Sequence, residues 1–362
     1  MERAAELHSL CRLHQAGEAR QLFPQRSDSF FGYTALSSLR ARKRTVEMFE
    51  IYQLEPDARE AEEPQGTRFK FWYSDERFGK VIDAQGRETG HDCLFKEGKS
   101  WSGETASERA AAELGALLGI PVARQELAVY LDRRGTVSPK FLALNESLVL
   151  GRELLERALP GYAVGENIPR DHTVANVLSV LARARPNPTI ARSAAIRTAA
   201  DQFVGYLLFD AWIGNMDRHH GNWALVSVAG WGDEGRYLAP SFDHGSSLGR
   251  ELRPELKLEM LDGDEPHQAL LNYAAAEKAR GRVYRDREDD KPLSPLSAFI
   301  EAAAQHPQAA EHWVRQLQSV NPAALDHVFE LFPDDWMSDA ARRFAVALLD
   351  TNRSRIVAAF AP

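Results

Sequence analysis

The sequence is poor in cysteine, has no long apolar run and carries no excess of positive charge. Its two cysteines, Cys11 and Cys93, stand far apart among 362 residues without metal-ligand spacing, so we expect two reduced thiols. No run of about eighteen apolar residues is present, so no transmembrane segment is expected. The opening residues lack a basic region followed by an apolar one, which predicts a cytoplasmic protein without a signal peptide. The net charge of −8 argues against nucleic-acid binding by the whole chain.

One short region, in contrast, is rich in the polar groups that phosphate chemistry uses. Residues 215–222 read Asn-Met-Asp-Arg-His-His-Gly-Asn, and Ser-Phe-Asp-His-Gly follows at 241–245. Phosphoryl transfer from ATP requires one carboxylate that accepts or orients the hydroxyl proton of the acceptor. It also requires an amide and a second carboxylate that hold Mg²⁺ against the phosphates. The pattern predicts a kinase in which Asp217 is catalytic and Asn222 and Asp243 bind the metal ion.

The local pattern around these residues predicts how they come together. Apolar residues spaced by three to five indicate a helix over 198–213, which Gly214 ends. A loop follows, and then two strands joined by a glycine-rich turn at 230–235. This hairpin returns Asp243 to the neighbourhood of Asn222, where two oxygen ligands can share one hard cation. Mg²⁺ suits such a site because it uses few protein ligands, and Mn²⁺ is the alternative.

Each of these residues has an ordinary interpretation when it is taken alone. An isolated Asp-Arg-His is usually a solvated turn, and Asp or Asn beside Gly usually tolerates a left-handed backbone. The combination and its order favour the functional interpretation. The adjacent histidines do not form a zinc site, because no Cys or carboxylate lies at ligand spacing. We expect His219 to orient the catalytic loop, and we expect His220 to be exposed.

A second group of charged residues lies upstream. Residues 92–96 form a short apolar run that ends in Lys96, which is typical of a buried strand. A helix follows that Ser102 is expected to cap. Glu104 and Glu108 lie four residues apart on that helix and therefore on one face, so either can reach Lys96. We select Glu108, which lies deeper in the helix. Composition alone favours a surface lysine, and the downstream motif is what makes Lys96 a candidate site residue.

Both groups resemble known kinases. The run Asp-Arg-His-His-Gly-Asn at 217–222 resembles the catalytic loop of phosphatidylinositol 3- and 4-kinases, where Asp-Arg-His-x-x-Asn recurs. The length and the remaining pattern are more similar to the bacterial HipA-like kinases. Cys-Leu-Phe-Lys at 93–96 resembles the family strand whose lysine contacts ATP phosphates, and the segment from Glu104 resembles the helix that bears the acidic partner of that lysine. The resemblance covers about residues 70–361.

The resemblance implies an α+β, two-lobed protein-kinase-like fold with a small strand-rich N-lobe and a larger helical C-lobe. It implies ATP and Mg²⁺ as cofactors, with Lys96, Glu108, Asn222 and Asp243 around them. It also implies a protein or peptide substrate that is phosphorylated on serine or threonine, and it leaves an antitoxin-like partner open.

The sequence departs from protein kinases at the loop that covers the phosphates. No Gly-x-Gly-x-x-Gly is present, and Ser74, Lys80, Gly86 and Gly90 are scattered candidates, each also consistent with an ordinary turn or surface residue. The metal motif is Asp-His-Gly, and no Ala-Pro-Glu follows it. Regulation through an ordinary activation loop is therefore not expected.

The chain divides into three predicted parts. Residues 1–66 form a helical extension that ends in a polar connection. Residues 67–145 form the N-lobe, in which strands over 125–131 and 137–144 make a hairpin with a turn at 132–135. Residues 146–362 form the C-lobe. Within it, the arginine-rich segment 276–291 is expected to be an exposed loop or a lid.

Three functions remain open from the sequence. The first is a kinase that acts on a protein or peptide, and the second is a lipid or small-molecule kinase of phosphatidylinositol-kinase type. The third is a nucleotide-binding module without turnover. The residues that follow Asp243, at 246–262, carry charges of both signs instead of the basic surface that an inositol headgroup requires. This favours the first.

Overall fold

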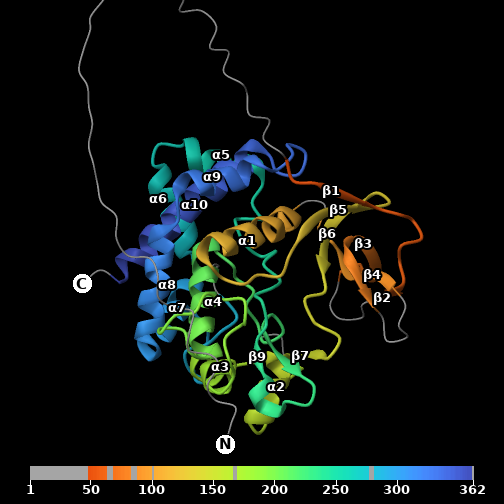
Figure 1. The fold of residues 1–362 in the computed structure, drawn as a ribbon. Coiled ribbons are helices and arrows are strands. Elements are labelled where there is room, and N and C mark those ends of the chain that lie inside the picture. Colours follow the sequence, from red (N-terminus) through yellow and green to blue (C-terminus); the bar gives the residue numbers. More distant parts are fainter. Residues whose placement is uncertain are drawn as a thin grey trace, which may run out of the picture. The chain divides into compact units, whose positions relative to one another are not determined.

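A six-stranded sheet organises the N-terminal part of the structure, a computed structural model (Figure 1). The structure describes residues 48–62, 68–82, 88–99, 102–165, 169–276 and 281–360, and the predicted helices of residues 1–47 lie outside this range. The strands are β1 (Ile51–Leu54), β2 (Ala61–Glu62), β3 (Lys70–Ile82), β4 (Glu88–Glu97), β5 (Glu126–Tyr130) and β6 (Arg133–Pro139). Their order is β1-β5-β6-β4-β3-β2, with β1 parallel to β5 and the other pairs antiparallel. The sheet therefore includes residues before residue 66, where the predicted lobe boundary falls.

Alternation along the strands gives the sheet two different faces. Phe71, Tyr73, Cys93 and Phe95 are buried together in one apolar cluster. Lys96 follows Phe95 in β4 and therefore points to the opposite face, because successive side chains of a strand alternate. The helix α1 (Glu104–Leu118) contacts β5 and β6 and ends at Gly119 in a left-handed conformation. The fold thus places the lysine on the face of the sheet that does not carry the aromatic cluster.

The predicted hairpin is confirmed, but its turn is shorter than expected. Tyr130 pairs with Arg133, so the turn consists of Leu131 and Asp132, with Leu131 at a positive φ of 56°. Residues 133–135, which were expected to turn, belong to β6 instead. The second strand also ends earlier than predicted, at Pro139.

The remaining residues form a three-stranded sheet and most of the helices. The strands β7 (Glu146–Leu150), β8 (Ala224–Val228) and β9 (Tyr237–Leu238) pair in that order and antiparallel. The helices are α2 (Gly151–Ala158), α3 (Val174–Leu181), α4 (Ala199–Ile213), α5 (Pro254–Asp262), α6 (Pro266–Ala275), α7 (Pro295–Gln305), α8 (Pro307–Ser319), α9 (Pro322–Glu330) and α10 (Asp339–Ala358). Proline begins each helix from α5 to α9, because its fixed φ suits the first helical turn and its missing N–H has no partner there. In the described part of the chain, no helix combines the length and the apolar character needed to cross a membrane.

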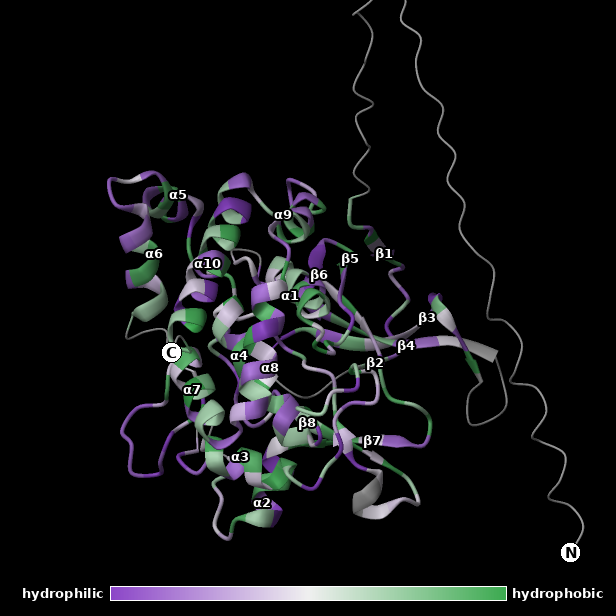
Figure 2. Cartoon of the chain, turned by 60° about the vertical axis from the view of Figure 1, so that its left-hand side comes forward, coloured by the Kyte–Doolittle hydropathy of each residue, from purple (hydrophilic) through white to green (hydrophobic). Residues whose placement is uncertain are grey.

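Helix α4 is the centre of this part of the molecule, with α7, α8 and α10 packed around it (Figure 2). All fifteen of its residues are buried. Thr198 caps its first turn and Gly214, at a φ of 69°, ends it, so the predicted helix is confirmed. Gly205 permits close packing, since a Cβ there would lie 2.4 Å from the Trp313 indole. A rigid, buried helix therefore leads directly into the candidate catalytic loop.

Candidate functional site

Three of the predicted residues meet at one point. The Lys96 ammonium at the end of β4 donates to Glu108 Oε1 at 3.2 Å and to Asp243 Oδ1 at 2.6 Å. Glu108 lies in the second turn of α1, and Asp243 follows β9. The choice of Glu108 agrees with this contact, while Glu104 instead accepts a hydrogen bond from Arg68 at 2.9 Å. A strand, a helix and a loop that are distant in sequence thus deliver one cation and two carboxylates to the same place.

The Asp-His-Gly segment is held against α1 by its backbone. The N–H of His244 donates to Glu108 Oε2 at 2.9 Å, so Glu108 receives Lys96 on one oxygen and the backbone on the other. A Cβ at Gly245 would lie 2.8 Å from Glu104 Cγ, which explains glycine at this position. Asp243 itself has a φ of 60°, a left-handed conformation that aspartate tolerates better than most residues. Such strained backbone persists where its surroundings enforce it, and here α1 does so.

Charge pairing dominates the electrostatics of this group. Burial alone would lower the pKa of Lys96, but the two carboxylates raise it above its usual value. Burial alone would raise the pKa of Asp243, but the adjacent ammonium holds it below its usual range. Burial raises the pKa of Glu108, and Lys96 opposes that effect. Lys96 is therefore positively charged and Asp243 negatively charged at neutral pH.

The loop that carries Asp217 is closed by hydrogen bonds to its own backbone. Asn222 Nδ2 donates to the Asp217 carbonyl at 2.8 Å, and the N–H of His219 donates to the same oxygen at 2.8 Å. His219 Nδ1 accepts the N–H of Gly221 at 2.9 Å, so this nitrogen carries no proton. Burial lowers the pKa of His219, which also favours the neutral ring. These contacts agree with a His219 that orients the loop.

The amide of Asn222 is oriented by the same contacts. Because its nitrogen must face a carbonyl oxygen, its Oδ1 is the atom left over, and Oδ1 makes no hydrogen bond within the described ranges. The Asp243 side chain is 41% exposed, so its carboxylate remains accessible despite the contact with Lys96. Nowhere in the described part of the chain do three His, Cys, Asp or Glu side chains gather as a metal site. The donors here, one amide oxygen and one carboxylate, fit a hard cation that takes its other ligands from water or phosphate.

Arg218 connects the two groups, a role that the sequence reasoning missed. Its guanidinium donates to Asp210 of α4 at 2.7 and 2.8 Å, to the Asn222 carbonyl at 2.6 Å and to Ser241 Oγ at 2.9 Å. The side chains of Arg218 and Asp210 are only 3% and 2% exposed. The available signal was Asp210, a single carboxylate near the end of an otherwise apolar stretch of helix.

Arg282 is a second residue that the sequence reasoning missed. Its Nε lies 3.0 Å from Asp217 Oδ1, and the two side chains are 40% and 34% exposed. It belongs to the charged segment 276–291, of which residues 277–280 lie outside the described range. The expectation of an exposed loop is wrong for Val283 and Tyr284, which are 3% and 7% exposed.

Two smaller predictions need correction. His220 is buried and not exposed, with 5% of its surface accessible, because it packs below the loop and shares a 2.8 Å hydrogen bond with the Tyr162 hydroxyl. The N-cap of α1 is Gly103 and not Ser102, although the Ser102 hydroxyl does accept the N–H of Glu104 at 3.4 Å.

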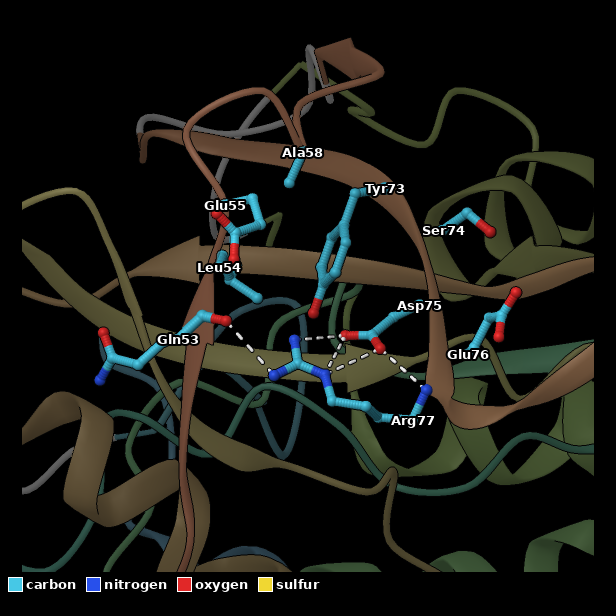
Figure 3. A pocket seen from close by; sticks show the side chains of 9 residues that line it. All are labelled: Gln53, Leu54, Glu55, Ala58, Tyr73, Ser74, Asp75, Glu76 and Arg77. Atoms are coloured by element: carbon cyan, nitrogen blue, oxygen red, sulfur yellow. Dashed lines mark hydrogen bonds and ion pairs between the residues drawn. The ribbon is translucent and has the colours of Figure 1, made fainter.

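The candidates for a phosphate-covering loop are not brought to this site by any described contact. Ser74, Lys80 and Gly90 lie in the β3–β4 hairpin, and Gly86 lies outside the described residues. Ser74 instead lines a hollow of about 320 Å³ on β1 and β3, in which Arg77 is paired with Asp75 (Figure 3). None of Lys96, Glu108, Asp217, Asn222 and Asp243 lines that hollow.

Comparisons with known proteins bear on the fold. No protein-family model matches the chain, and no curated protein sequence does. The crystal structure of CtkA, a proinflammatory kinase of Helicobacter pylori, is similar with a TM-score of 0.62 and 16% identity, over 86% of this chain and 96% of CtkA. HipA of Shewanella oneidensis, solved with HipB and operator DNA, is matched with a TM-score of 0.46 and 15% identity, over 84% of this chain and 66% of HipA. The likeness to CtkA shows that the chain has the predicted two-lobed kinase-like fold.

Proposed function

We propose that the chain is an ATP-dependent phosphotransferase, a HipA-like kinase that phosphorylates serine or threonine in a protein or peptide. One observation carries this proposal. Lys96, Glu108 and Asp243 converge within 3.2 Å, and Arg218 ties this group to the loop that holds Asp217 and Asn222. The kinase-like fold supports it, and Lys96 lies on a strand and Glu108 on the helix that follows it, as expected.

Lys96 is the residue we assign to the ATP phosphates, and Glu108 orients it. Asn222 Oδ1 and the Asp243 carboxylate are assigned to Mg²⁺, with Mn²⁺ as the alternative. These two oxygen ligands would hold the cation, which would supply positive charge against the negative charge of the phosphates. Asp243 and Glu108 together keep the ammonium of Lys96 charged before nucleotide arrives.

Asp217 is assigned to the acceptor hydroxyl. Its carboxylate is one-third exposed, whereas its backbone is fixed by Asn222 and His219. A carboxylate that is accessible and rigidly held is suited to accept or orient a proton, since a general base must lie within hydrogen-bond distance of the group it deprotonates. His219 remains a residue that positions this loop.

The lipid-kinase alternative requires free positive charge after Asp243. Within 246–262, Arg250 lies 4.0 Å from Glu104. Lys257 is 5% exposed and lies above the Phe344 ring. Two of the three cations of this segment thus face the protein, which favours a protein or peptide acceptor over an anionic headgroup.

Transfer of labelled phosphate from ATP tests the proposal. The purified full chain is incubated with Mg²⁺ and labelled ATP, alone, with a protein mixture, and with phosphatidylinositol vesicles, beside the Asp217→Asn variant. We expect label on serine or threonine that the variant does not transfer. Label on the lipid instead supports the lipid kinase. Binding of Mg²⁺–ATP by calorimetry without any transfer supports the non-catalytic module, and neither binding nor transfer contradicts all three.

A further inference from the structure

Arg282 places a second positive charge beside the candidate catalytic carboxylate. Its Nε donates to Asp217 Oδ1 at 3.0 Å. Nε makes the only hydrogen bond of this guanidinium within the described part of the chain, and the side chain is 40% exposed. The hydrogen bond to Asp217 thus uses the Nε–H of the guanidinium and leaves its terminal N–H groups available.

The backbone around Arg282 is fixed, although its side chain is accessible. The N–H of Gly281 donates to the Leu293 carbonyl at 2.8 Å, and the N–H of Leu293 donates to the Val283 carbonyl at 2.8 Å. The N–H of Tyr284 donates to the His172 carbonyl at 3.0 Å. Val283, Tyr284 and Leu293 are buried, so apolar side chains anchor the chain that follows the arginine, while Gly281 before it is held by its backbone. Arg282 therefore does not stand at the tip of a free loop.

Hydrogen bonds through His172 and Trp223 connect the backbone of Arg282 to the catalytic loop. Its carbonyl accepts from His172 Nδ1 at 2.7 Å, and His172 Nε2 accepts from the Trp223 indole at 3.1 Å. Trp223 follows Asn222, whose amide donates to the Asp217 carbonyl, and Arg282 Nε donates to the Asp217 carboxylate. His172 is fully buried, and burial lowers its pKa to about 3, so both of its bonds are made by the neutral ring. These contacts fix the position of Arg282 relative to the Asp217 carboxylate.

Because Arg282 and the acceptor hydroxyl would share the Asp217 carboxylate, Arg282 can reach a group bound there. For Asp217 to accept a proton, the acceptor hydroxyl must lie within hydrogen-bond distance of it. Arg282 already lies within hydrogen-bond distance of the same group. The acceptor oxygen and the guanidinium are therefore neighbours, and so is the phosphoryl group that moves onto that oxygen.

We propose that Arg282 is a catalytic residue that binds the transferring phosphoryl group; the proposal rests on the phosphotransferase function above. In the transfer, a bond forms between the acceptor oxygen and the γ-phosphorus. The bond to the bridging oxygen breaks, its electron pair leaves with ADP, and the hydroxyl proton passes to Asp217. Negative charge spreads over the three oxygens of the moving group, and a planar guanidinium can donate to two of them at once. Protonation removes the charge of Asp217, which weakens its bond to Arg282 and releases the arginine towards the phosphoryl group.

Substitution of Arg282 by alanine tests this role. We expect Arg282→Ala to lower kcat by about 10²-fold or more, the effect of removing one charge-stabilising donor, while KM for ATP changes little. Added guanidinium ion should restore part of the rate in Arg282→Ala and none in Asp217→Asn, because only the former leaves a space of guanidinium shape. Arg285→Ala is the matched control, since Arg285 belongs to the same segment but pairs with Glu301 at 3.3 Å.

A binding measurement separates this role from a structural one and needs no acceptor. ADP with Mg²⁺ and aluminium fluoride imitates the moving phosphoryl group. Calorimetry should show that Arg282→Ala binds this complex much more weakly than the unmodified chain does, and that both bind ADP alone equally. Equal affinity for the fluoride complex overturns the proposal.

The kinetic outcomes distinguish the proposal from its premise. An increase in rate in Arg282→Ala shows that the arginine blocks Asp217 and overturns the catalytic role. A raised KM for the acceptor with an unchanged kcat shows that it only reads the substrate, which also overturns it. If Asp217→Asn loses transfer while Arg282→Ala keeps it, the inference fails and the proposed function stands. If the unmodified chain transfers nothing, the proposed function fails.

Discussion

Two arginine–aspartate pairs involve the same loop, and they differ in burial. Arg218 meets Asp210 at 2.7 Å, and Arg282 meets Asp217 at 3.0 Å. The first pair is 3% and 2% exposed, and the second is 40% and 34% exposed. We call the buried Arg218–Asp210 pair the floor of the site and the exposed Arg282–Asp217 pair its rim.

The difference in burial separates structure from function. A buried pair must be fully hydrogen-bonded, because removing one partner leaves an unpaired charge away from water. Arg218 meets that requirement through Asp210, two backbone carbonyls and Ser241. An exposed pair is worth only about 0–1 kcal/mol and can open easily. The open pair is therefore the one that can exchange partners during a reaction, and the closed pair is the one that fixes the loop.

The largest expected effect comes from breaking the open pair at its carboxylate. Asp217→Asn should lower turnover by about 10²–10⁴-fold, since it removes a positioned general base, while Mg²⁺–ATP binding stays nearly intact. Asp243→Asn should weaken nucleotide binding as well as turnover, because it removes a ligand of the cation. Calorimetry with a non-hydrolysable ATP analogue, run beside a transfer assay, checks both. Loss of binding in Asp217→Asn together with retained binding in Asp243→Asn reverses the two assignments.

The closed pair should reveal itself in stability. Asp210→Ala leaves Arg218 buried without its carboxylate and should lower the free energy of unfolding by about 3–5 kcal/mol. Asp217→Ala, which breaks the open pair, should change it by no more than about 1 kcal/mol. Urea unfolding of the two variants beside the unmodified chain measures the difference. Equal losses of stability would remove the distinction between floor and rim.

The two carboxylate partners of Lys96 show the same contrast in burial, since Glu108 is 3% exposed and Asp243 is 41% exposed. Lys96→Met should lower transfer by about 10²–10³-fold, the loss expected for one stabilising donor, without unfolding the chain. Glu108→Gln should act in the same direction and Glu104→Gln should not, because only Glu108 contacts the ammonium. Transfer assays with circular dichroism as the folding control decide this. Full activity in Lys96→Met removes the lysine from the site, and an effect confined to Glu104→Gln moves the acidic partner.

The sequence was informative where a residue's role depends on its near neighbours. Thr198 and Gly214 delimit α4, and the glycine-rich turn returns the chain so that Asp243 reaches Lys96. Within the N-lobe sheet, the sequence predicted the β5–β6 hairpin and the part of β4 that ends in Lys96. The pairing of β1 with β5 joins residues 76 positions apart, such as Ile51 and Leu127, and no local periodicity indicates such a partner.

The missed site residues share a physical reason. Arg218 stands inside the motif itself, but its importance comes from Asp210, Ser241 and Asn222, which surround it only after folding. Arg282 stands in a charged segment that is typical of an exposed loop, and its contact with Asp217 depends on buried neighbours that are not consecutive in sequence. His220 was placed at the surface because a loop histidine usually is, and here the loop packs against Tyr162. Charged residues were misjudged wherever long-range packing decided their exposure.

The smallest expected effect concerns how the stability of the fold depends on pH through two buried histidines. Burial lowers the pKa of His172 to about 3 and that of His220 to about 4, whereas an unfolded histidine has a pKa of about 6.5. Below about pH 6.5 these histidines therefore bind protons in the unfolded chain but not in the folded chain. The sign follows directly: stability is complete above that pH and falls as the pH decreases towards the folded pKa values. Each such histidine contributes a slope that approaches about 1.4 kcal/mol per pH unit.

Urea unfolding between about pH 7 and about pH 5 measures this slope. His172→Gln removes the titrating ring and keeps one donor and one acceptor for Arg282 and Trp223. It should therefore reduce the slope by an amount that approaches about 1.4 kcal/mol per pH unit at the acidic end, whatever its effect at neutral pH. His327→Gln is the control, because that histidine is 57% exposed. An unchanged slope in His172→Gln contradicts a neutral, buried His172. It also removes the support that this ring gives to Arg282, because a charged His172 could not accept the indole N–H of Trp223.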